Sequence, residues 1–363
     1  MNGTERIRVT RAQVLAHRAA AHGLDRSTPA PAVLALGVQD TPAGSAALAL
    51  AARGASAEGL ERVWSFRGAP HLHRREDLAA LATALWPADD ADATARLSST
   101  VIKEGARLGV EAFRAAALAL RTVVTGPTPK GVASAGVTAL VPRSLAFDCA
   151  TCGSRHVSGL LFQQAGLFGA VRVTAAGGTT LAPLDPGFPL PTAAHGTADL
   201  VEDHLRFLGP ATPAGIAKSL GVRTPVVDAA RPADLTEVDV DGTTAWARTA
   251  DVDALRAARP SRAAADVRLL PPGDPYLQAR DRELLVPDAA RRKEVWRAIG
   301  NPGVLLLGSE PAGTWRAKAA GRRVDLTVTP FVPLPAAARR ALEAEADLVA
   351  RTRGASEARL LLP

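Results

Sequence analysis

The stretch TPAGIAKSLGVRTP, residues 212–225, decides the fold of this chain. Thr212 is a good helix N-cap, and Pro213 fits the first helical turn, where a backbone amide has no partner to lose. Gly221 suits the left-handed turn that ends a helix. A second Thr-Pro pair at 224–225 then starts another helix. The stretch therefore predicts two short helices joined by a tight glycine turn, which is a helix-turn-helix.

The flanking residues extend this prediction to a winged helix. Apolar residues recur on one face over 197–209, which predicts a preceding helix. Downstream, LTEVDV (235–240) and TTAWA (243–247) have strand composition, and Asp241-Gly242 between them is a strong hairpin signal. The order of helix, helix-turn-helix and β-hairpin is that of a winged helix.

The same pattern is expected twice more in the chain. TPKGVASAGV at 128–137 repeats the stretch at 212–222 with a single-residue gap, and an alanine-rich helix is expected before it over 105–124. A third copy opens the chain, with helices expected over 9–24, 31–38 and 41–54 and a wing over 60–75. We therefore predict three tandem winged helices, with boundaries at 1–100, 101–195 and 196–260.

The last third of the chain, 261–363, has a different pattern. We expect a strand, a Pro/Gly turn and another strand over 265–288, a helix over 291–300, a three-stranded meander over 302–334 and a closing helix over 336–354. This predicts an antiparallel β-domain. The fold class is therefore α+β, mainly α.

The composition limits the classes of function. The formal charge is +7 at pH 7, and 38 of the 43 basic residues are arginine, which binds phosphate and guanine edges well. No apolar run approaches the ~20 residues that span a membrane, and no secretory signal is apparent at the N-terminus. We expect a soluble, cytoplasmic and monomeric protein that binds double-stranded DNA and no membrane. No phosphate-binding loop or dinucleotide fingerprint occurs, so no cofactor is expected.

The loop ALGVQDTPAGSA, residues 35–46, holds the candidate catalytic residues Gln39, Asp40 and Thr41. They precede an expected helix, so their polar groups lie beside unpaired amides and the positive end of the helix dipole. One interpretation is that Asp40 or Thr41 only caps the helix and Gln39 is a solvated turn residue. The other is that the loop forms a reaction site.

The expected first wing, RGAPHLHRR, gathers Arg67, His71, His73 and Arg74. In a strand the two histidines share a face. They are candidates for DNA contact, with an ordinary solvated surface as the alternative; a metal site is not expected, because no cysteine or carboxylate lies nearby. Further candidate DNA contacts are Arg223, Thr224, Arg316 and Lys318.

The segment CATCGSRH offers Cys149, Cys152 and His156, which is half of a zinc ribbon. A fourth ligand and a second pair are missing, and no βαβ pattern supports thioredoxin-like redox chemistry. We therefore expect a reduced structural pair of cysteines and no metal. In PPGDPYLQARDR, a salt-linked turn through Asp274, Arg280 and Asp281 is favoured over a direct role in a site.

Several of these segments together resemble the winged-helix DNA glycosylases of the AlkZ and YcaQ type. The resemblance is carried by LGVQD, by VWSFRGAPHLH, by FLGPATPAGIA, and by RLLPPGDPYLQARDR with AGTWR. It covers roughly residues 10–350. It implies three winged helices around a basic concave channel, and removal of alkylated bases from DNA.

In that family a Gln-x-Gln or Gln-x-Asp motif in the channel is linked to catalysis. Gln39 matches the first position, but the third position is Thr41, and Asp40 stands one place early. An N7-alkylated purine is already a good leaving group, so the protein has mainly to position water and stabilise charge on the sugar. Gln39 would then orient the water and Asp40 would supply charge. The alternatives are a DNA-binding regulator or damage sensor without catalysis, and a protein-interaction scaffold.

Overall fold

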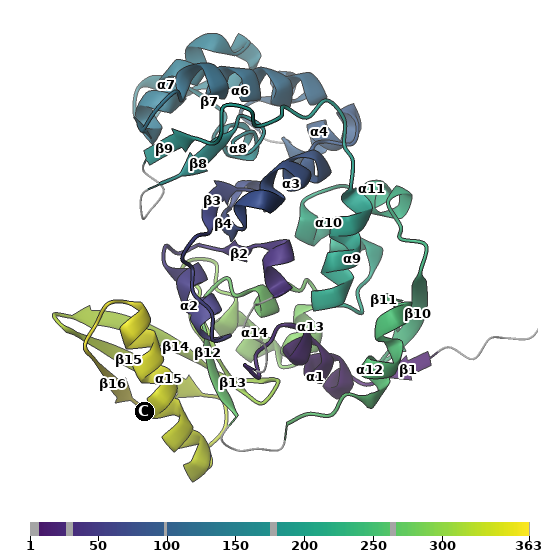
Figure 1. Cartoon of the computed structure of the whole chain (residues 1–363), viewed down its shortest axis with the longest axis vertical. Helices are drawn as coiled ribbons and strands as arrows, with labels where there is room; N and C mark the ends of the chain where they lie inside the picture. Colours follow the sequence, from purple (N-terminus) through teal and green to yellow (C-terminus); the bar gives the residue numbers. More distant parts are fainter. Residues whose placement is uncertain (1–6, 27–31, 98–99, 175–179, 262–265, 363) are drawn as a thin grey trace, which may run out of the picture.

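The computed structural model describes residues 7–26, 32–97, 100–174, 180–261 and 266–362, and these form an α+β protein. Figure 1 shows helices α6 and α7 at the top, α9 to α11 on the right, and the last sheet with α15 at the lower left. None of the described helices is long and apolar enough to cross a membrane.

The first part of the chain forms a small three-stranded sheet with two helices. Its elements are α1 (Arg11–Ala21), the 3-10 turn η1 (Ala32–Leu36), β2 (Val38–Gln39), α2 (Ser45–Ala51), β3 (Glu61–Trp64), η2 (Phe66–Gly68) and β4 (Pro70–His73). The strands lie in the order β2-β4-β3. The predicted helix over 31–38 is only the 3-10 turn η1, and the predicted helix over 41–54 is confined to α2.

The second part is the lobe at the top of Figure 1. Its elements are α3 (Leu78–Leu85), α4 (Asp90–Arg96), α5 (Lys103–Ala106), α6 (Val110–Val123), β5 (Thr128–Pro129), α7 (Lys130–Leu140), β6 (Ala146–Cys149), β7 (Ser154–Val157), α8 (Gly159–Gln164), β8 (Val171–Val173) and β9 (Thr180–Pro183). The predicted helix over 105–124 is divided between α5 and α6. The helix α7 also differs from the prediction, because it continues past Gly136, which lies against Val123 instead of ending the helix.

The third part confirms the element order predicted around residues 212–225. Its elements are α9 (Thr197–Leu208), α10 (Pro213–Leu220), α11 (Thr224–Ala229), β10 (Leu235–Val240), β11 (Thr243–Arg248) and α12 (Val252–Ala257). Thr212 Oγ1 accepts from Gly215 N at 3.1 Å, and Gly221 ends α10 with φ +77°. The strand β1 (Ile7–Val9) adds to this sheet parallel to β10, which the sequence pattern did not suggest.

The same strand order recurs in these three parts. In each, a short segment before a helix pairs with the second strand of the following hairpin: β2 with β4, β5 with β9, and Ala211 with Trp246 of β11. The repeated sequence pattern thus corresponds to a repeated pairing of strands.

The last part is a five-stranded sheet covered by one long helix. Its elements are β12 (Val267–Leu270), η6 (Pro275–Gln278), α13 (Arg282–Leu285), α14 (Ala289–Val295), β13 (Gly303–Leu307), β14 (Glu310–Ala320), β15 (Arg323–Pro330), α15 (Ala336–Thr352) and β16 (Glu357–Leu361). The meander of β13 to β15 and the closing helix are as predicted. Two predictions were wrong: η6 and α13 replace the second strand expected over 265–288, and β16 runs parallel to β15, so the sheet is mixed.

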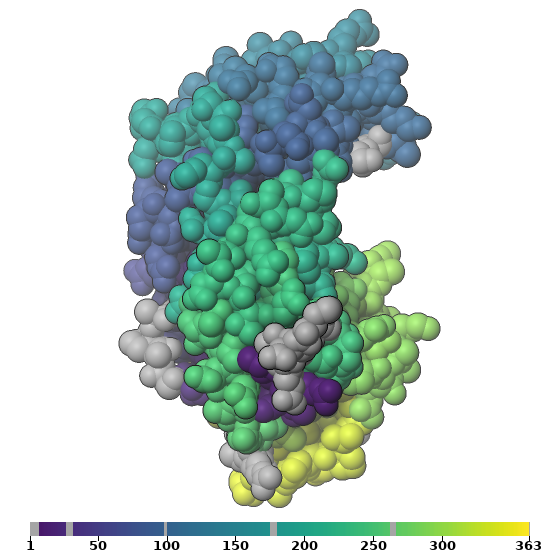
Figure 2. Space-filling view, turned by 90° about the vertical axis from the view of Figure 1, so that its right-hand side faces the viewer, coloured from purple at the N-terminus to yellow at the C-terminus, as the bar shows by residue number. Residues whose placement is uncertain are grey.

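One core joins the first part of the chain to the last. It contains Leu15, Leu50, Phe207, Tyr276 and Val304, all of them inaccessible to solvent. The loops after β2 and β12 are therefore fixed against each other across this core. In the view of Figure 2 the outline of the molecule is concave between the blue lobe at the top and the light-green segment below it.

Candidate active site

Gln39 lies at the end of β2, where it pairs with His71 of β4, and its side chain lines a cavity of about 450 Å³. The opposite walls come from the loop after β12 and from the segment that follows α14. Within the described ranges, the amide of Gln39 makes no hydrogen bond to another side chain or to the backbone. It is therefore free to bind a ligand or a water molecule in the cavity.

The charged side chains that line this cavity are all arginines. They are Arg67, Arg280, Arg282 and Arg297; no Asp or Glu is among the described lining residues. Burial, and then the neighbouring Arg280, lower the pKa of Arg67 to about 10, so Arg67 remains cationic at neutral pH. The Nε of Arg280 is buried, and it has no hydrogen-bond partner among the described residues. Such a set of donors suits an anionic ligand such as a phosphate.

Asp40 is directed away from this cavity and caps the turn before α2. It is only 5% exposed. Its Oδ1 accepts from the backbone amides of Gly44 at 2.8 Å and Ala46 at 3.1 Å, and its Oδ2 pairs with Arg62 Nε at 2.8 Å. Asp40 does not line the cavity. Its contacts are those of a residue that caps the helix, which was the first of the two interpretations of this loop. Thr41 is exposed and does line the cavity.

The loop after β12 approaches Gln39 closely because residue 273 is a glycine. Gly273 has φ +78°, and a Cβ there would lie 2.9 Å from the carbonyl oxygen of Thr41. The same Cβ would be 3.6 Å from the side-chain nitrogen of Gln39. The shape of the cavity beside Gln39 therefore depends on this backbone conformation.

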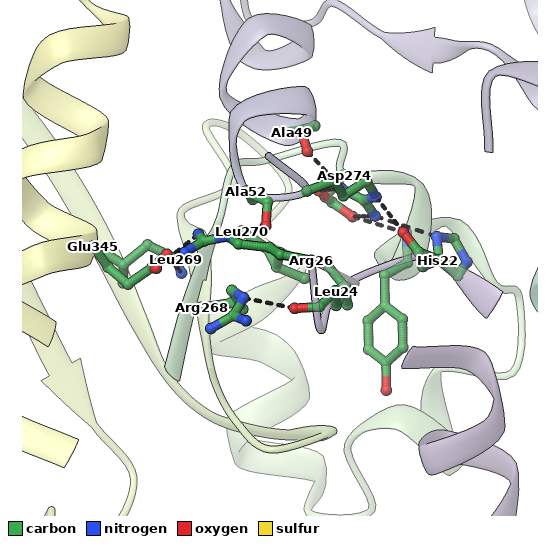
Figure 3. A network of polar contacts seen from close by, with 12 residues as sticks. His22, Leu24, Arg26, Ala49, Ala52, Arg268, Leu269, Leu270, Asp274 and Glu345 are labelled. Carbon is green, nitrogen blue, oxygen red and sulfur yellow. Dashed lines mark hydrogen bonds and ion pairs between the residues drawn. The ribbon is translucent and has the colours of Figure 1, made fainter. Parts of the chain in front are cut away.

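A buried ion pair fixes that loop. Asp274 is fully buried and binds both terminal nitrogens of Arg53, at 2.8 and 2.9 Å. Arg53 also donates to the backbone carbonyls of His22 and Ala49, and Asp274 accepts from Tyr276 N at 2.9 Å. Figure 3 shows Asp274 beside Ala49 and His22, where segments distant in sequence meet. Asp274 and Asp281 are both ion-paired, as the sequence suggested, but their partners are the distant Arg53 and Arg18, the latter at 2.6 Å. The expected turn between two strands is not formed, and Arg280 lines the cavity.

The hairpin histidines do not form the exposed basic pair that the sequence suggested. His71 is 5% exposed and His73 is 1% exposed. Burial lowers the pKa of each imidazole to about 3, so both are neutral at pH 7. His71 contacts the carbonyl oxygen of Ala69 at 2.9 Å, and His73 lies 3.0 Å from Ser65 Oγ. The two histidines are buried because both faces of β4 are covered, and their contacts lie inside the hairpin.

Arg67 and Arg74 of the same hairpin differ in position. Arg67 adopts φ +58°, lies against Gly221 and donates to the carbonyl of Ser219, so it connects the first hairpin to the end of α10. Arg74 is half-buried and pairs with Asp77 at 3.5 Å, outside the cavity.

The remaining candidate DNA contacts fall into two places. Arg316 and Lys318 are exposed on one face of β14, and Arg316 donates to the carbonyl of Gly300, at the edge of the Gln39 cavity. Arg223 and Thr224 start α11 away from the cavity; Arg223 N donates to Asp92 of α4 at 3.0 Å. The structure thus places Arg67 in the lining of the Gln39 cavity and Arg316 against Gly300 at its edge, whereas Arg223 and Thr224 do not line the cavity.

Sequence reasoning missed two of the cavity arginines and their aromatic neighbour. Arg282 stacks on the ring of Trp296 at 5.0 Å, and Arg297 follows that tryptophan. A second cavity of about 750 Å³ shares Arg280, Arg282 and Trp296 with the first and extends to α10. The available signal was the concentration of basic residues around Trp296 in RRKEVWR, which we interpreted only as a helix.

Comparison with known proteins agrees with this architecture. The family model described as DNA glycosylase AlkZ-like matches residues 33–352. The solved structure of the Streptomyces sahachiroi DNA glycosylase AlkZ superposes on 98% of this chain and 100% of its own, with a TM-score of 0.73 and 19% sequence identity. At that identity the likeness shows a shared fold. No curated protein matches the sequence.

Proposed function

We propose that this chain, which belongs to the AlkZ-like family of DNA glycosylases, binds duplex DNA and hydrolyses the N-glycosidic bond of an alkylated base. One observation carries the proposal: the amide of Gln39, which has no hydrogen-bond partner among the residues that the structure describes, lies in a cavity whose charged lining residues are arginines. Such a cavity suits the phosphates of a distorted or extruded nucleotide, and a nucleotide bound there would have its sugar beside a water-binding amide.

When the purine that leaves is already a cation, the reaction does not need a strong general base in the protein. Departure of an N7-alkylated purine leaves positive charge on the sugar, and water then adds at C1′ and loses a proton to solvent. Gln39 would accept a hydrogen bond from that water and orient its oxygen. The arginines would repel a cationic base, so we assign them to the flanking phosphates, whose charge in turn stabilises the sugar cation.

Asp40 has a positioning role in this proposal. Its carboxylate caps the turn at Gly44 and Ala46 and pairs with Arg62, so it fixes the backbone that carries Gln39. We no longer assign it the catalytic charge expected from the sequence. Thr41, at the cavity wall, would contact the DNA backbone.

The three repeated arrangements of short strand, helix and hairpin are proposed to be winged helices. The support is the common strand order, with β2, β5 and Ala211 in the same role. Arg67 in the cavity and Arg316 beside its edge at Gly300 are proposed DNA contacts. The monomeric state and the cytoplasmic location remain predictions.

A second function, damage binding without catalysis, is favoured by a different observation. The cavity lining includes no carboxylate among the described residues, and Thr41 replaces the Gln or Asp expected at the third motif position. A lesion whose base is neutral would then bind without being released.

The deciding experiment uses duplex DNA that carries one N7-methylguanine. Base release and binding are measured together for the wild type, for Gln39→Ala, and for the control Gln163→Ala, whose half-buried side chain on α8 lies outside the cavity. We expect Gln39→Ala to slow release by about 100-fold, the typical loss of one transition-state contact, with little change in binding. Salt-sensitive binding without release by the wild type would instead establish the second function.

A further inference from the structure

The hairpin of β6 and β7 lies in the second part of the chain, between α7 and α8. Phe147 pairs with His156 and Cys149 pairs with Ser154, so these four side chains share one face of the hairpin. Cys152 lies in the connecting turn. The hairpin takes no part in the Gln39 cavity, and the proposed reaction does not use it.

Three ligand atoms converge at the tip of this hairpin. One ligand atom from each of Cys149, Cys152 and His156 lies within 4.8 Å of the other two. Cys152 Sγ is 2.7 Å from His156 Nε2. No other group of three His, Cys, Asp or Glu side chains in the described ranges has this convergence. The half-ribbon pattern in the sequence is therefore a compact cluster in three dimensions.

The turn has the backbone geometry that brings two cysteines together. Gly153 adopts φ +64°, and its amide donates to the carbonyl of Cys149 at 2.9 Å. A Cβ at Gly153 would contact nothing, so the glycine is needed for its left-handed backbone and not for space. Cys152 is exposed and Cys149 is half-buried, so a metal ion can reach both.

We propose that Cys149, Cys152 and His156 bind one Zn²⁺ ion at the tip of the β6–β7 hairpin. Two thiolates and one imidazole are ligands that Zn²⁺ prefers, and binding releases the two thiol protons. The sequence argued against zinc because a fourth ligand is missing. An open tetrahedral site needs only three protein ligands, and water completes it.

The ion would fix the turn end of a short hairpin. Isolated two-stranded hairpins are marginally stable, and each strand here has four residues. Its described links include the Arg155–Asp148 ion pair and the bond from Val157 N to Thr138 Oγ1. Zn²⁺ would close the turn end, next to the Arg155–Asp148 pair and away from the buried base of the hairpin at Ala146 and Val157.

The test uses Co²⁺ as a spectroscopic probe on the full chain, freed of metal and reduced with a phosphine. The chain has only two cysteines, so any thiolate-to-cobalt absorption band must come from this hairpin. We expect one Co²⁺ per chain, tetrahedral visible bands, and their loss on addition of one equivalent of Zn²⁺. Hydrogen exchange of residues 146–157 should slow in the zinc form.

Three variants give the result its specificity. Cys152→Ser should abolish the thiolate band, and His156→Ala should weaken Co²⁺ binding at least about 10-fold. The matched control His195→Ala removes an exposed histidine elsewhere and should change nothing.

Three results would overturn the proposal. The first is no thiolate band in the reduced protein at one equivalent of Co²⁺. The second is one ion per two chains, with dimers on gel filtration, which would mean that two hairpins share the metal. The third is unchanged affinity in His156→Ala. None of these results bears on base release, so the zinc site and the proposed function can fail separately.

Discussion

Arg53 and Asp274 form the buried ion pair that holds the loop carrying Gly273, next to the candidate site. Asp274 is fully buried and Arg53 is 1% exposed, and the two are joined by a bidentate ion pair. Removing one partner leaves an uncompensated charge in the interior, at a cost of about 3–5 kcal/mol. We expect Asp274→Ala to lower the free energy of unfolding by this amount, as measured by urea denaturation.

The matched control is an ion pair at the surface. Glu111 pairs with Arg114 one turn along α6 and is 64% exposed, so Glu111→Gln should change the unfolding free energy by no more than about 1 kcal/mol. Equal effects of the two substitutions would contradict the structural role of the Asp274 pair.

Four buried imidazoles predict how stability depends on pH. Burial lowers the pKa of His71, His73 and His204 to about 3, and that of His22 well below its usual value. Histidine in the unfolded chain titrates near pH 6.5. Between pH 6.5 and 3 the unfolded state therefore binds more protons, and stability falls as the pH falls through this window. Each histidine lowers the free energy of unfolding by up to about 1.4 kcal/mol for every pH unit within this window.

Urea denaturation at pH 7.5, 6.0 and 5.0 measures this dependence while most carboxylates stay ionised. We expect the unfolding free energy to decrease as the pH is lowered. His204→Gln should reduce the slope by up to about a quarter, since it removes one of the four fully buried imidazoles, and burial also lowers the pKa of the less buried His17. The exposed His195, changed to Ala, should leave the slope unchanged. A wild type with the same stability at all three values would show that the imidazoles are not buried in solution.

At the scale of elements, Gly221 both ends α10 and leaves room for the side chain of Arg67. Gly221 has φ +77°, and a Cβ there would lie 2.7 Å from Cγ of Arg67. We expect Gly221→Ala to destabilise the fold by about 1–2 kcal/mol, the cost of a left-handed alanine. It should also weaken DNA binding, because Arg67 has to leave its place in the cavity. Thermal unfolding and a binding titration on the same sample measure both effects.

Gly131 is the control for this substitution. It lies in α7, and a Cβ there would contact nothing. Gly131→Ala should therefore stabilise the helix by up to about 1 kcal/mol and leave DNA binding unchanged. If Gly221→Ala were equally stabilising, the left-handed cap would not be needed.

Elements whose signal is local could be predicted from the sequence. The caps of α10, the Asp241-Gly242 turn and the meander with turns at 308–309 and 321 depend on residues that are close in the chain. In contrast, β1 pairs with β10, more than 200 residues away, and β16 pairs in parallel with β15 across the whole of α15. No short-range pattern encodes such a partner.

The candidate site was predictable only in part, for the same reason. The position of Gln39 in a loop before a helix was evident from the sequence. That Asp40 turns away to Arg62, and that His71 and His73 are buried, depends on residues that pack over them in three dimensions. Propensity says nothing about which face of a short strand will be covered.

At the scale of the whole molecule, the arginines of the cavity come from parts of the chain more than 200 residues apart. Arg67 belongs to the first hairpin, while Arg280, Arg282 and Arg297 follow β12 and α14. The core shared by the first and last parts holds them together. A net charge of +7 alone would give weak, diffuse attraction to DNA, whereas this grouping concentrates the positive charge where Gln39 lies.

This grouping predicts the salt dependence of DNA binding. Each phosphate contact contributes about −0.9 to the slope of log K against log salt, through release of a counterion. The double variant Arg280→Ala/Arg297→Ala should therefore reduce the magnitude of the slope by about 2, on any duplex sequence. The control Arg339→Ala/Arg340→Ala changes two exposed arginines of α15, which packs beneath Trp315 on the face of the sheet opposite Arg316. Both variants lose the same net charge, so equal slopes would mean that overall charge, and not the cavity, binds the DNA.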